Sequence, residues 1–248
     1  MGVRNYPHFL WTILFTDRET PPLAPAATPS PALGQNMNAP LISNDEPPTA
    51  AAEAKLALAD PRLAELIERI GPCPLGTLRR DPFDALVVAI VGQQLSTKAA
   101  ATLRERLQTR IGAARPFEPG HFRPYSAETL QGAGLSGAKA RALLHLAAVV
   151  ERGELDLAGL ACQADEAVIA ALVGLPGIGR WTAEMLLIFS LGRPDVLSMT
   201  DSGLRRAARR LYGLPDRDDE AFQRLAEGWR PYRSVASWYL WRFLDQPP

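Results

Sequence analysis

The sequence predicts an all-α fold for residues 51–248, preceded by a tail that has no core of its own. Beyond residue 51, apolar residues recur at helical spacing in one segment after another. No segment shows the strict alternation of apolar and polar residues that a half-buried strand requires. Between positions 21 and 50, by contrast, eight of thirty residues are proline. These observations predict one helical domain behind an irregular N-terminal segment.

The tail, residues 1–50, is predicted to be disordered, because a stretch rich in proline and alanine buries too little apolar surface to offset its ordering entropy. The apolar patch at 9–15 is too short to cross a bilayer, and no small-residue cleavage site follows it. We therefore expect a cytoplasmic protein with no membrane partner. Met37 lies inside the tail, and we expect translation to begin there. N-terminal sequencing that found Met1 would refute this start site.

Composition limits the classes of partner. The chain has 27 basic and 27 acidic residues, so no global positive field indicates a nucleic-acid partner. A DNA-binding function must therefore depend on local chemistry. The two cysteines, Cys73 and Cys162, lie far apart, which fits neither a disulfide framework nor an iron–sulfur cluster. We expect reduced thiols and no metal held by side chains.

Start and stop signals delimit the helices in order. Pro61 opens a helix that Gly71 ends, and Asp81 precedes the next. Ser96 is the predicted cap of a third helix, which Gly112 ends. The same signals predict helices after Ser126 and Ser136, and over 165–173, 180–191, 201–212, 218–227 and 232–244.

A short turn separates two of these helices, and its sequence is Leu175-Pro176-Gly177-Ile178-Gly179. Its glycines allow left-handed backbone and close approach of another chain. The helix after the turn begins with unpaired N–H groups, which favour an anion such as a DNA phosphate. Contacts through backbone amides need little net positive charge. Two glycines at this spacing also occur in ordinary connections between helices, so the turn alone leaves both interpretations open.

Three further segments decide the interpretation: 91–96 with Val-Gly-Gln-Gln-Leu-Ser, 196–206 around Asp201, and 229–241, which holds three tryptophans. In this order with 175–183, they resemble the helix–hairpin–helix DNA glycosylase superfamily, specifically its 3-methyladenine DNA glycosylase II branch, over residues 60–245. The resemblance implies two helical subdomains flanking a cleft and a monomer that acts on double-stranded DNA containing alkylated bases. Two-domain members carry a sheet domain before the helices, which residues 1–50 cannot form, so this chain resembles a compact form.

Asp201 is the predicted catalytic residue. It lies about twenty residues beyond the hairpin at the start of a helix, where an aspartate also serves as an ordinary N-cap. The resemblance assigns it to catalysis, and the two roles are compatible. Breaking an N-glycosidic bond builds positive charge on the sugar, and a buried carboxylate facing that sugar stabilises the charge and orients water.

Position 181 separates two chemistries. In the branch that resembles endonuclease III, a lysine at this position attacks the sugar as an amine nucleophile, whereas this chain has Trp181. Its three lysines, Lys55, Lys98 and Lys139, are distant in sequence from Asp201 and the hairpin. The sequence therefore predicts hydrolysis by water without a covalent intermediate. We expect no cofactor other than a monovalent or divalent cation at the hairpin backbone.

The resemblance also implies an aromatic pocket for the extruded, often cationic base. It places Trp181 and Trp241 in that pocket, with Trp238 and Tyr239 nearby on the last helix. Aromatic residues on helices usually pack in the core, and this alternative is strongest for Trp238 and Tyr239.

Two more groups are predicted to touch DNA. Gln93, Gln94 and Leu95 form a turn between apolar helices, and the resemblance makes Gln94 or Leu95 the wedge that fills the space left by the extruded nucleotide. Arg205 and Arg206 follow Asp201 and are candidates for phosphate contacts, although a solvated helix face fits them equally well.

Two alternative functions remain at this stage. The first is a DNA-binding module without enzymatic activity, since the hairpin occurs in such proteins; Asp201 at the catalytic spacing opposes it. The second is a glycosylase that also acts as a lyase; Trp181 and the absence of a cysteine cluster oppose it.

Overall fold

The structure, a computed structural model, describes residues 49–77, 80–95, 97–113, 116–215 and 218–245. All the regular secondary structure within these ranges is helical, so the all-α prediction is confirmed. No helix in the described ranges combines the length and the apolar character needed to cross a bilayer. Residues 1–48 lie outside the described ranges, so the predicted disorder of the tail and the start of translation at Met37 stay predictions.

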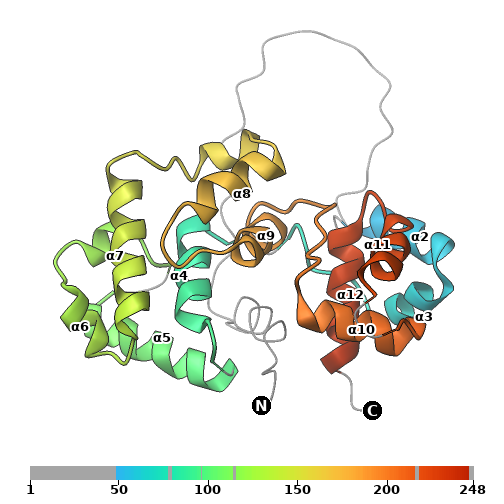
Figure 1. Ribbon diagram of the computed structural model, residues 1–248, viewed down its shortest axis with the longest axis horizontal. Helices are drawn as coiled ribbons and strands as arrows, with labels where there is room; N and C mark the ends of the chain where they lie inside the picture. Colours follow the sequence, from blue (N-terminus) through green and yellow to red (C-terminus); the bar gives the residue numbers. More distant parts are fainter. Residues whose placement is uncertain (1–48, 78–79, 96, 114–115, 216–217, 246–248) are drawn as a thin grey trace, which may run out of the picture.

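The helices form two groups that lie side by side (Figure 1). The first group holds the middle of the chain: α4 (Pro82–Gly92), α5 (Thr97–Ile111), α6 (Ala127–Gln131), α7 (Gly137–Glu151), α8 (Asp165–Val173) and α9 (Arg180–Phe189). The second group combines the two ends of the described chain: α2 (Ala50–Ala59), α3 (Pro61–Ile70), α10 (Ser202–Tyr212), α11 (Asp219–Glu227) and α12 (Arg233–Asp245). Short 3-10 turns at Pro119–Phe122 and Gly159–Cys162 complete the first group.

The first group is built around α4. Every residue of this helix from Phe83 to Gly92 is buried, because α5, α7 and α9 cover it. This all-round burial explains why the segment is apolar throughout instead of carrying a single apolar stripe.

The second group is held together by a buried polar network around Asp60. The Asp60 carboxylate caps α3 by accepting hydrogen bonds from the backbone N–H groups of Arg62 and Leu63. Its Oδ2 also accepts hydrogen bonds from the Tyr212 hydroxyl at 2.7 Å and from Trp229 Nε1 at 3.1 Å. One carboxylate therefore ties α3 to the end of α10 and to the segment before α12.

The predicted helix starts agree closely with the structure. Ser126 and Ser136 cap α6 and α7 by accepting bonds from backbone N–H groups, as predicted. The helix predicted over 180–191 ends earlier, at Phe189, because Ser190 and Leu191 turn the chain back. The predicted cap Ser96 lies outside the described residues. Helix α2 and the two 3-10 turns were not predicted.

Candidate active site

The Asp201 side chain lies where the two groups of helices meet. It is the N-cap of α10, and its Oδ1 accepts a hydrogen bond from Leu204 N–H at 2.6 Å. Only 2% of the residue is exposed. The capping role considered for this aspartate is therefore present, and it fixes the carboxylate at the start of the helix.

Two tryptophans donate hydrogen bonds to the same carboxylate from opposite sides of the junction. Trp181, in the first turn of α9, donates from Nε1 to Oδ2 at 2.8 Å. Trp241, on α12, donates from Nε1 to Oδ1 at 3.3 Å. Because α9 belongs to the first group of helices and α12 to the second, Asp201 joins the two groups.

Burial and hydrogen bonding act on the Asp201 carboxyl in opposite directions. Removal from water is the largest influence and raises its pKa above the ordinary value of 3.8. The donors at Leu204, Trp181, Trp241 and Gly203 favour the ionised form and lower the pKa. The site thus holds a carboxylate that is desolvated and at the same time compensated by fixed N–H dipoles. Such a group interacts strongly with a positive charge that develops nearby.

The aromatic residues predicted for the base pocket separate into two pairs. Trp241 is buried and lies 5.7 Å from the Phe189 ring, centroid to centroid, whereas Trp181 is half-buried. Trp238 packs edge-on against Tyr239 at 4.9 Å. The Tyr239 hydroxyl donates a hydrogen bond to Gly71 O at 2.9 Å, at the C-terminal end of α3. The structure therefore brings Trp181 and Trp241 to Asp201 and directs the Tyr239 hydroxyl elsewhere.

The hairpin, residues 175–179, connects α8 to α9. Gly177 has φ +80°, and a Cβ there would come within 2.9 Å of the Ala142 methyl on α7. The Ile178 side chain is buried in the core and anchors the turn, while Pro176, Gly177 and Gly179 are exposed. Gly179 is the N-cap of α9 and supplies no side-chain cap, so the first amides of α9 have no capping side chain. The first amides of α9 can therefore donate hydrogen bonds to a phosphate oxygen.

The wedge loop, residues 93–95, follows α4. Gln94 is exposed and adopts φ +60°, a left-handed conformation that is uncommon for a residue other than glycine. Leu95 is half-buried and packs against the core. Gln93 donates from Nε2 to Gly177 O at 2.7 Å, so the wedge loop and the hairpin are in direct contact. Gln94 is thus the residue of this loop that projects from the protein.

The two arginines predicted to contact phosphates have partners within the protein. Arg205 forms an ion pair with Asp219 at the start of α11. Arg206 is half-buried, and desolvation lowers its pKa. Their role in phosphate binding stays a prediction.

Glu184 is a second buried carboxylate near Asp201, and the sequence reasoning missed it. Ser198 Oγ donates to its Oε2 at 2.5 Å, and Arg180 Nε donates to its Oε1 at 3.0 Å. Burial is the main cause that raises the pKa of this carboxyl. Since Asp201 N–H donates to Ser198 O at 3.2 Å, Glu184 supports the turn that carries the catalytic candidate. A glutamate inside the apolar run of a predicted helix is the signal that could have identified it.

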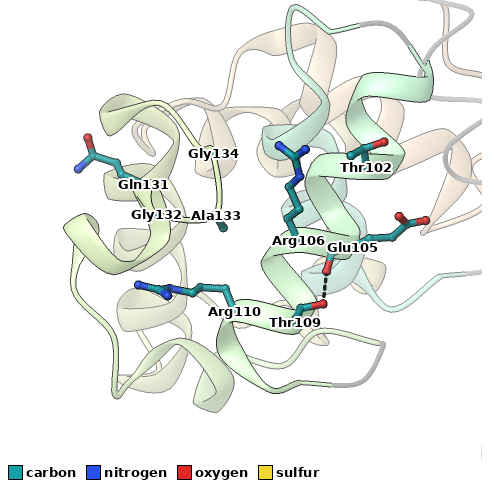
Figure 2. Close-up of a pocket in the computed structure, with 9 residues that line it drawn as sticks. All are labelled: Thr102, Glu105, Arg106, Thr109, Arg110, Gln131, Gly132, Ala133 and Gly134. Atoms are coloured by element: carbon teal, nitrogen blue, oxygen red, sulfur yellow. Dashed lines mark hydrogen bonds between the residues drawn. The ribbon is translucent and has the colours of Figure 1, made fainter.

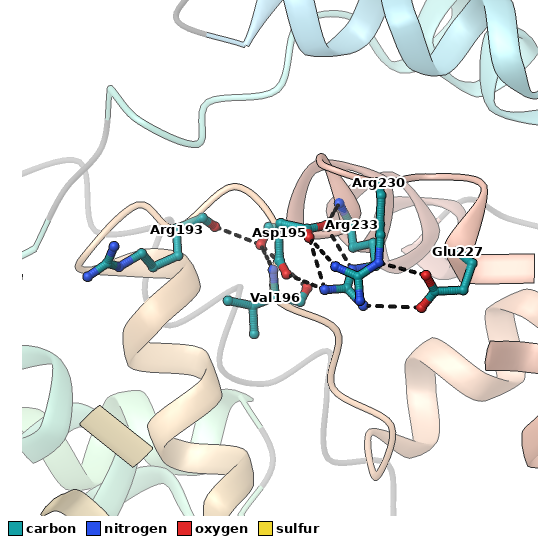
Figure 3. A network of polar contacts seen from close by, with 7 residues as sticks. Arg193, Asp195, Val196, Glu227, Arg230 and Arg233 are labelled. Atoms are coloured by element: carbon teal, nitrogen blue, oxygen red, sulfur yellow. Dashed lines mark hydrogen bonds and ion pairs between the residues drawn. The ribbon is translucent and has the colours of Figure 1, made fainter. Parts of the chain in front are cut away.

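The linker between α9 and α10 is fastened to the start of α12 (Figure 3). Asp195 accepts hydrogen bonds from Arg230 Nη1 at 2.7 Å and from Arg233 Nε at 2.7 Å. Ser234 Oγ accepts from Val196 N–H at 2.9 Å and donates to Arg193 O at 2.7 Å. The linker therefore holds Asp201 in a fixed relation to the helix that carries Trp241.

Among the cavities lined by described residues are two that lie outside this cluster and contain arginine side chains. One, of about 330 Å³, is lined by charged residues of both groups, among them Arg180, Glu184 and Arg233, and marks the cleft predicted between the subdomains. The other, of about 670 Å³, lies between α5 and the turn that joins α6 to α7 (Figure 2). Arg106 and Arg110 line this second cavity, and Asp201 lines neither.

Fold and site together define a helix–hairpin–helix protein with a buried aspartate at the junction of two helical groups. The model of the HhH-GPD superfamily of base excision DNA repair proteins matches residues 87–231. The chain therefore belongs to this superfamily, and the resemblance noted in the sequence is confirmed.

Relatives and solved structures agree with this family. The chain is 33% identical over 172 residues to DNA-3-methyladenine glycosylase 1 of Schizosaccharomyces pombe, covering 66% of this chain and 73% of that protein. A crystal structure of DNA-3-methyladenine glycosidase from Bacillus halodurans matches with TM-score 0.69 and 39% identity, over 80% of this chain and 93% of the other. A 3-methyladenine DNA glycosylase of S. pombe in complex with abasic DNA matches with TM-score 0.70 and 30% identity, over 79% and 98%.

Proposed function

We propose that this protein is a monofunctional DNA glycosylase that hydrolyses the N-glycosidic bond of alkylated purines, of the 3-methyladenine and 7-methylguanine type, in double-stranded DNA. The observation that carries the proposal is the Asp201 carboxylate, buried at the junction and hydrogen-bonded by Trp181 and Trp241. The relatives, whose names specify 3-methyladenine, support this substrate class.

The chemistry follows from the site. The hairpin amides hold a phosphate of the damaged strand, and Gln94 fills the space from which the nucleotide rotates outward. The indole of Trp181 offers an electron-rich face to a cationic base. As the bond from C1′ to the base nitrogen breaks, its electron pair leaves with the base and the sugar becomes positive. Asp201 stabilises this cation and orients the water that adds to C1′, and the proton that this water loses passes to the Asp201 carboxylate.

The lysines of the chain support hydrolysis instead of amine attack. Lys139 Nζ donates to Val91 O at 2.9 Å and to Gln93 O at 2.6 Å, which directs it to the wedge loop. Lys55 contacts the Tyr232 hydroxyl on the second group. Lys98 is exposed at the start of α5. In the described part of the chain, none of the residues that donate these hydrogen bonds to Asp201 is a lysine, and position 181 is tryptophan.

An excision assay on a panel of lesions tests the proposal. Duplexes carrying 7-methylguanine, 3-methyladenine, etheno-adenine or hypoxanthine are incubated with the protein, and released bases are separated by chromatography. We expect release of at least the two methylated purines, with the strand remaining intact until alkali is added. Sodium borohydride is expected to trap no covalent adduct, because only an amine nucleophile gives one. A trapped adduct would support the lyase alternative, and binding without release would support the non-enzymatic alternative.

A further inference from the structure

Three segments far apart in the sequence meet at the start of α7. Lys139, in the first turn of this helix, donates from Nζ to two carbonyl oxygens, Val91 O at 2.9 Å and Gln93 O at 2.6 Å. Val91 belongs to the last turn of α4, and Gln93 is the C-cap of the same helix. One ammonium group therefore binds both the last turn of α4, through Val91, and the first residue of the wedge loop, Gln93.

The contact has a clear electrostatic basis. The last carbonyl groups of a helix lack partners within the helix, and the helix dipole makes this end negative. A lysine ammonium with several donors satisfies such carbonyls. Half-burial of Lys139 strengthens the contact, because the carbonyl dipoles act there through little intervening water. The contact thus fixes where α4 ends and at what angle the chain leaves it.

The next residue, Gln94, needs such a fixed exit. Its φ of +60° is unfavourable for a residue with a Cβ, and its side chain is exposed. A backbone conformation of this kind persists when the surrounding structure determines it. The carbonyls of Val91 and Gln93, which precede Gln94 and are held by Lys139, supply this constraint from one side. Gln93 supplies it from the other, through its bond to Gly177 O at 2.7 Å.

The same helix also supports the hairpin. Ala142 lies one turn after Lys139 on α7. Its methyl group packs so close to Gly177 that a Cβ at position 177 would clash with it. Helix α7 therefore contacts the wedge loop through Lys139 and the hairpin through Ala142. The two predicted DNA-contacting elements are held in a single arrangement before DNA binds.

We propose that Lys139 is a positioning residue for base extrusion, which acts through Gln94 by holding the wedge loop against the hairpin. This inference rests on the proposed function, because extrusion matters only if the protein acts on a base within duplex DNA. Lys139 donates to backbone carbonyls of the protein, so its proposed role involves no contact with the base or the sugar. Its loss should therefore slow excision only where extrusion is costly, in a paired duplex, and not where the lesion is already unpaired.

The test compares one lesion in two contexts. Single-turnover excision of 7-methylguanine is measured with the lesion paired in a duplex and with the same lesion inside an unpaired bubble, for wild type, Lys139→Met and Lys139→Arg. We expect Lys139→Met to slow excision about tenfold on the paired lesion and less than about threefold in the bubble, because extrusion costs less from an unpaired site. Lys139→Arg, which keeps the donors and the charge, should restore most of the paired rate.

A matched control and a double variant sharpen the test. Lys98→Met also removes one positive charge near the wedge loop in sequence. Among the described residues the donor to the carbonyls of Val91 and Gln93 is Lys139, so Lys98→Met should leave the ratio of the two rates unchanged. In a Gln94→Gly background, Lys139→Met should have little further effect, since both act on the same step. Lys139→Gln, which keeps a donor, replaces Lys139→Met if melting curves show that the methionine variant is unfolded.

The outcomes are distinguishable. An equal loss on both substrates, or an additive effect in the Gln94→Gly background, would overturn the positioning role and leave the glycosylase function intact. If the wild-type protein released 7-methylguanine from neither substrate, that result would instead contradict the proposed function itself.

Discussion

Asp201→Asn is expected to slow single-turnover excision of 7-methylguanine by about 10³-fold or more, while affinity for duplex DNA stays within about threefold. Asparagine keeps an oxygen for the bond from Leu204 N–H, so the cap of α10 is retained. It removes the negative charge that, in the proposed mechanism, stabilises the sugar cation. Because we expect the hairpin and the wedge loop to hold the DNA, binding should not depend on that charge. Excision rates and fluorescence anisotropy measure the two quantities separately.

Asp218→Asn is the matched control for this change. Asp218 is also the N-cap of a helix in the second group, where it accepts a bond from Ala221 N–H at 2.8 Å. The two variants therefore make the same chemical change at the same kind of position, and only one of them lies at the junction. Asp218→Asn should excise within about twofold of wild type. Equal excision by the two variants would remove Asp201 from the mechanism.

Gly177→Ala is expected to reduce affinity for duplex DNA about tenfold or more. The new methyl group would meet the Ala142 methyl at 2.9 Å, and the φ of +80° is unfavourable for alanine. A hairpin that relaxes out of this conformation must return to it on binding DNA, and the backbone strain of about 1–2 kcal/mol that this return costs corresponds to roughly tenfold in the binding constant. The hairpin must shift to relieve the clash, which displaces the amides from the phosphate. The loss should be similar for all DNA sequences, because backbone amides do not read bases.

Gly213→Ala is the control for the backbone penalty. Gly213 ends α10 with φ +71°, and nothing lies within 4 Å of a Cβ built there. This variant should lose stability without losing DNA affinity in the folded protein. If Gly177→Ala bound DNA as tightly as Gly213→Ala, the hairpin would not be the main phosphate contact.

The helices could be predicted because their signals are local. Ser126 and Ser136 cap helices through bonds to residues three positions away, and proline and glycine mark the neighbouring boundaries. Helix α2 does not use such a cap: Thr49 makes no side-chain cap, and its hydroxyl bonds instead to Cys73 O at 2.7 Å. That contact depends on the tertiary fold, so the residues around it do not indicate it.

The candidate site divides in the same way. Asp201, Trp181 and Trp241 were predicted because each stands in a segment that resembles the superfamily. Glu184 was not, since its bond to Ser198 joins positions 14 residues apart and depends on how the linker folds back. The contact of Gln93 with Gly177 spans 84 residues, and no spacing in the sequence indicates it. Long-range polar contacts of this kind appear only once the helices are packed.

Affinity for two abasic-site analogues tests the charge on Asp201 most directly. One duplex carries a neutral tetrahydrofuran in place of the damaged nucleoside, and the other carries a pyrrolidine, whose protonated nitrogen resembles the sugar cation. We expect wild type to bind the cationic analogue about 100-fold more tightly than the neutral one, and Asp201→Asn to bind both alike. A preference for the cation that persists undiminished in Asp201→Asn would contradict the role of this carboxylate.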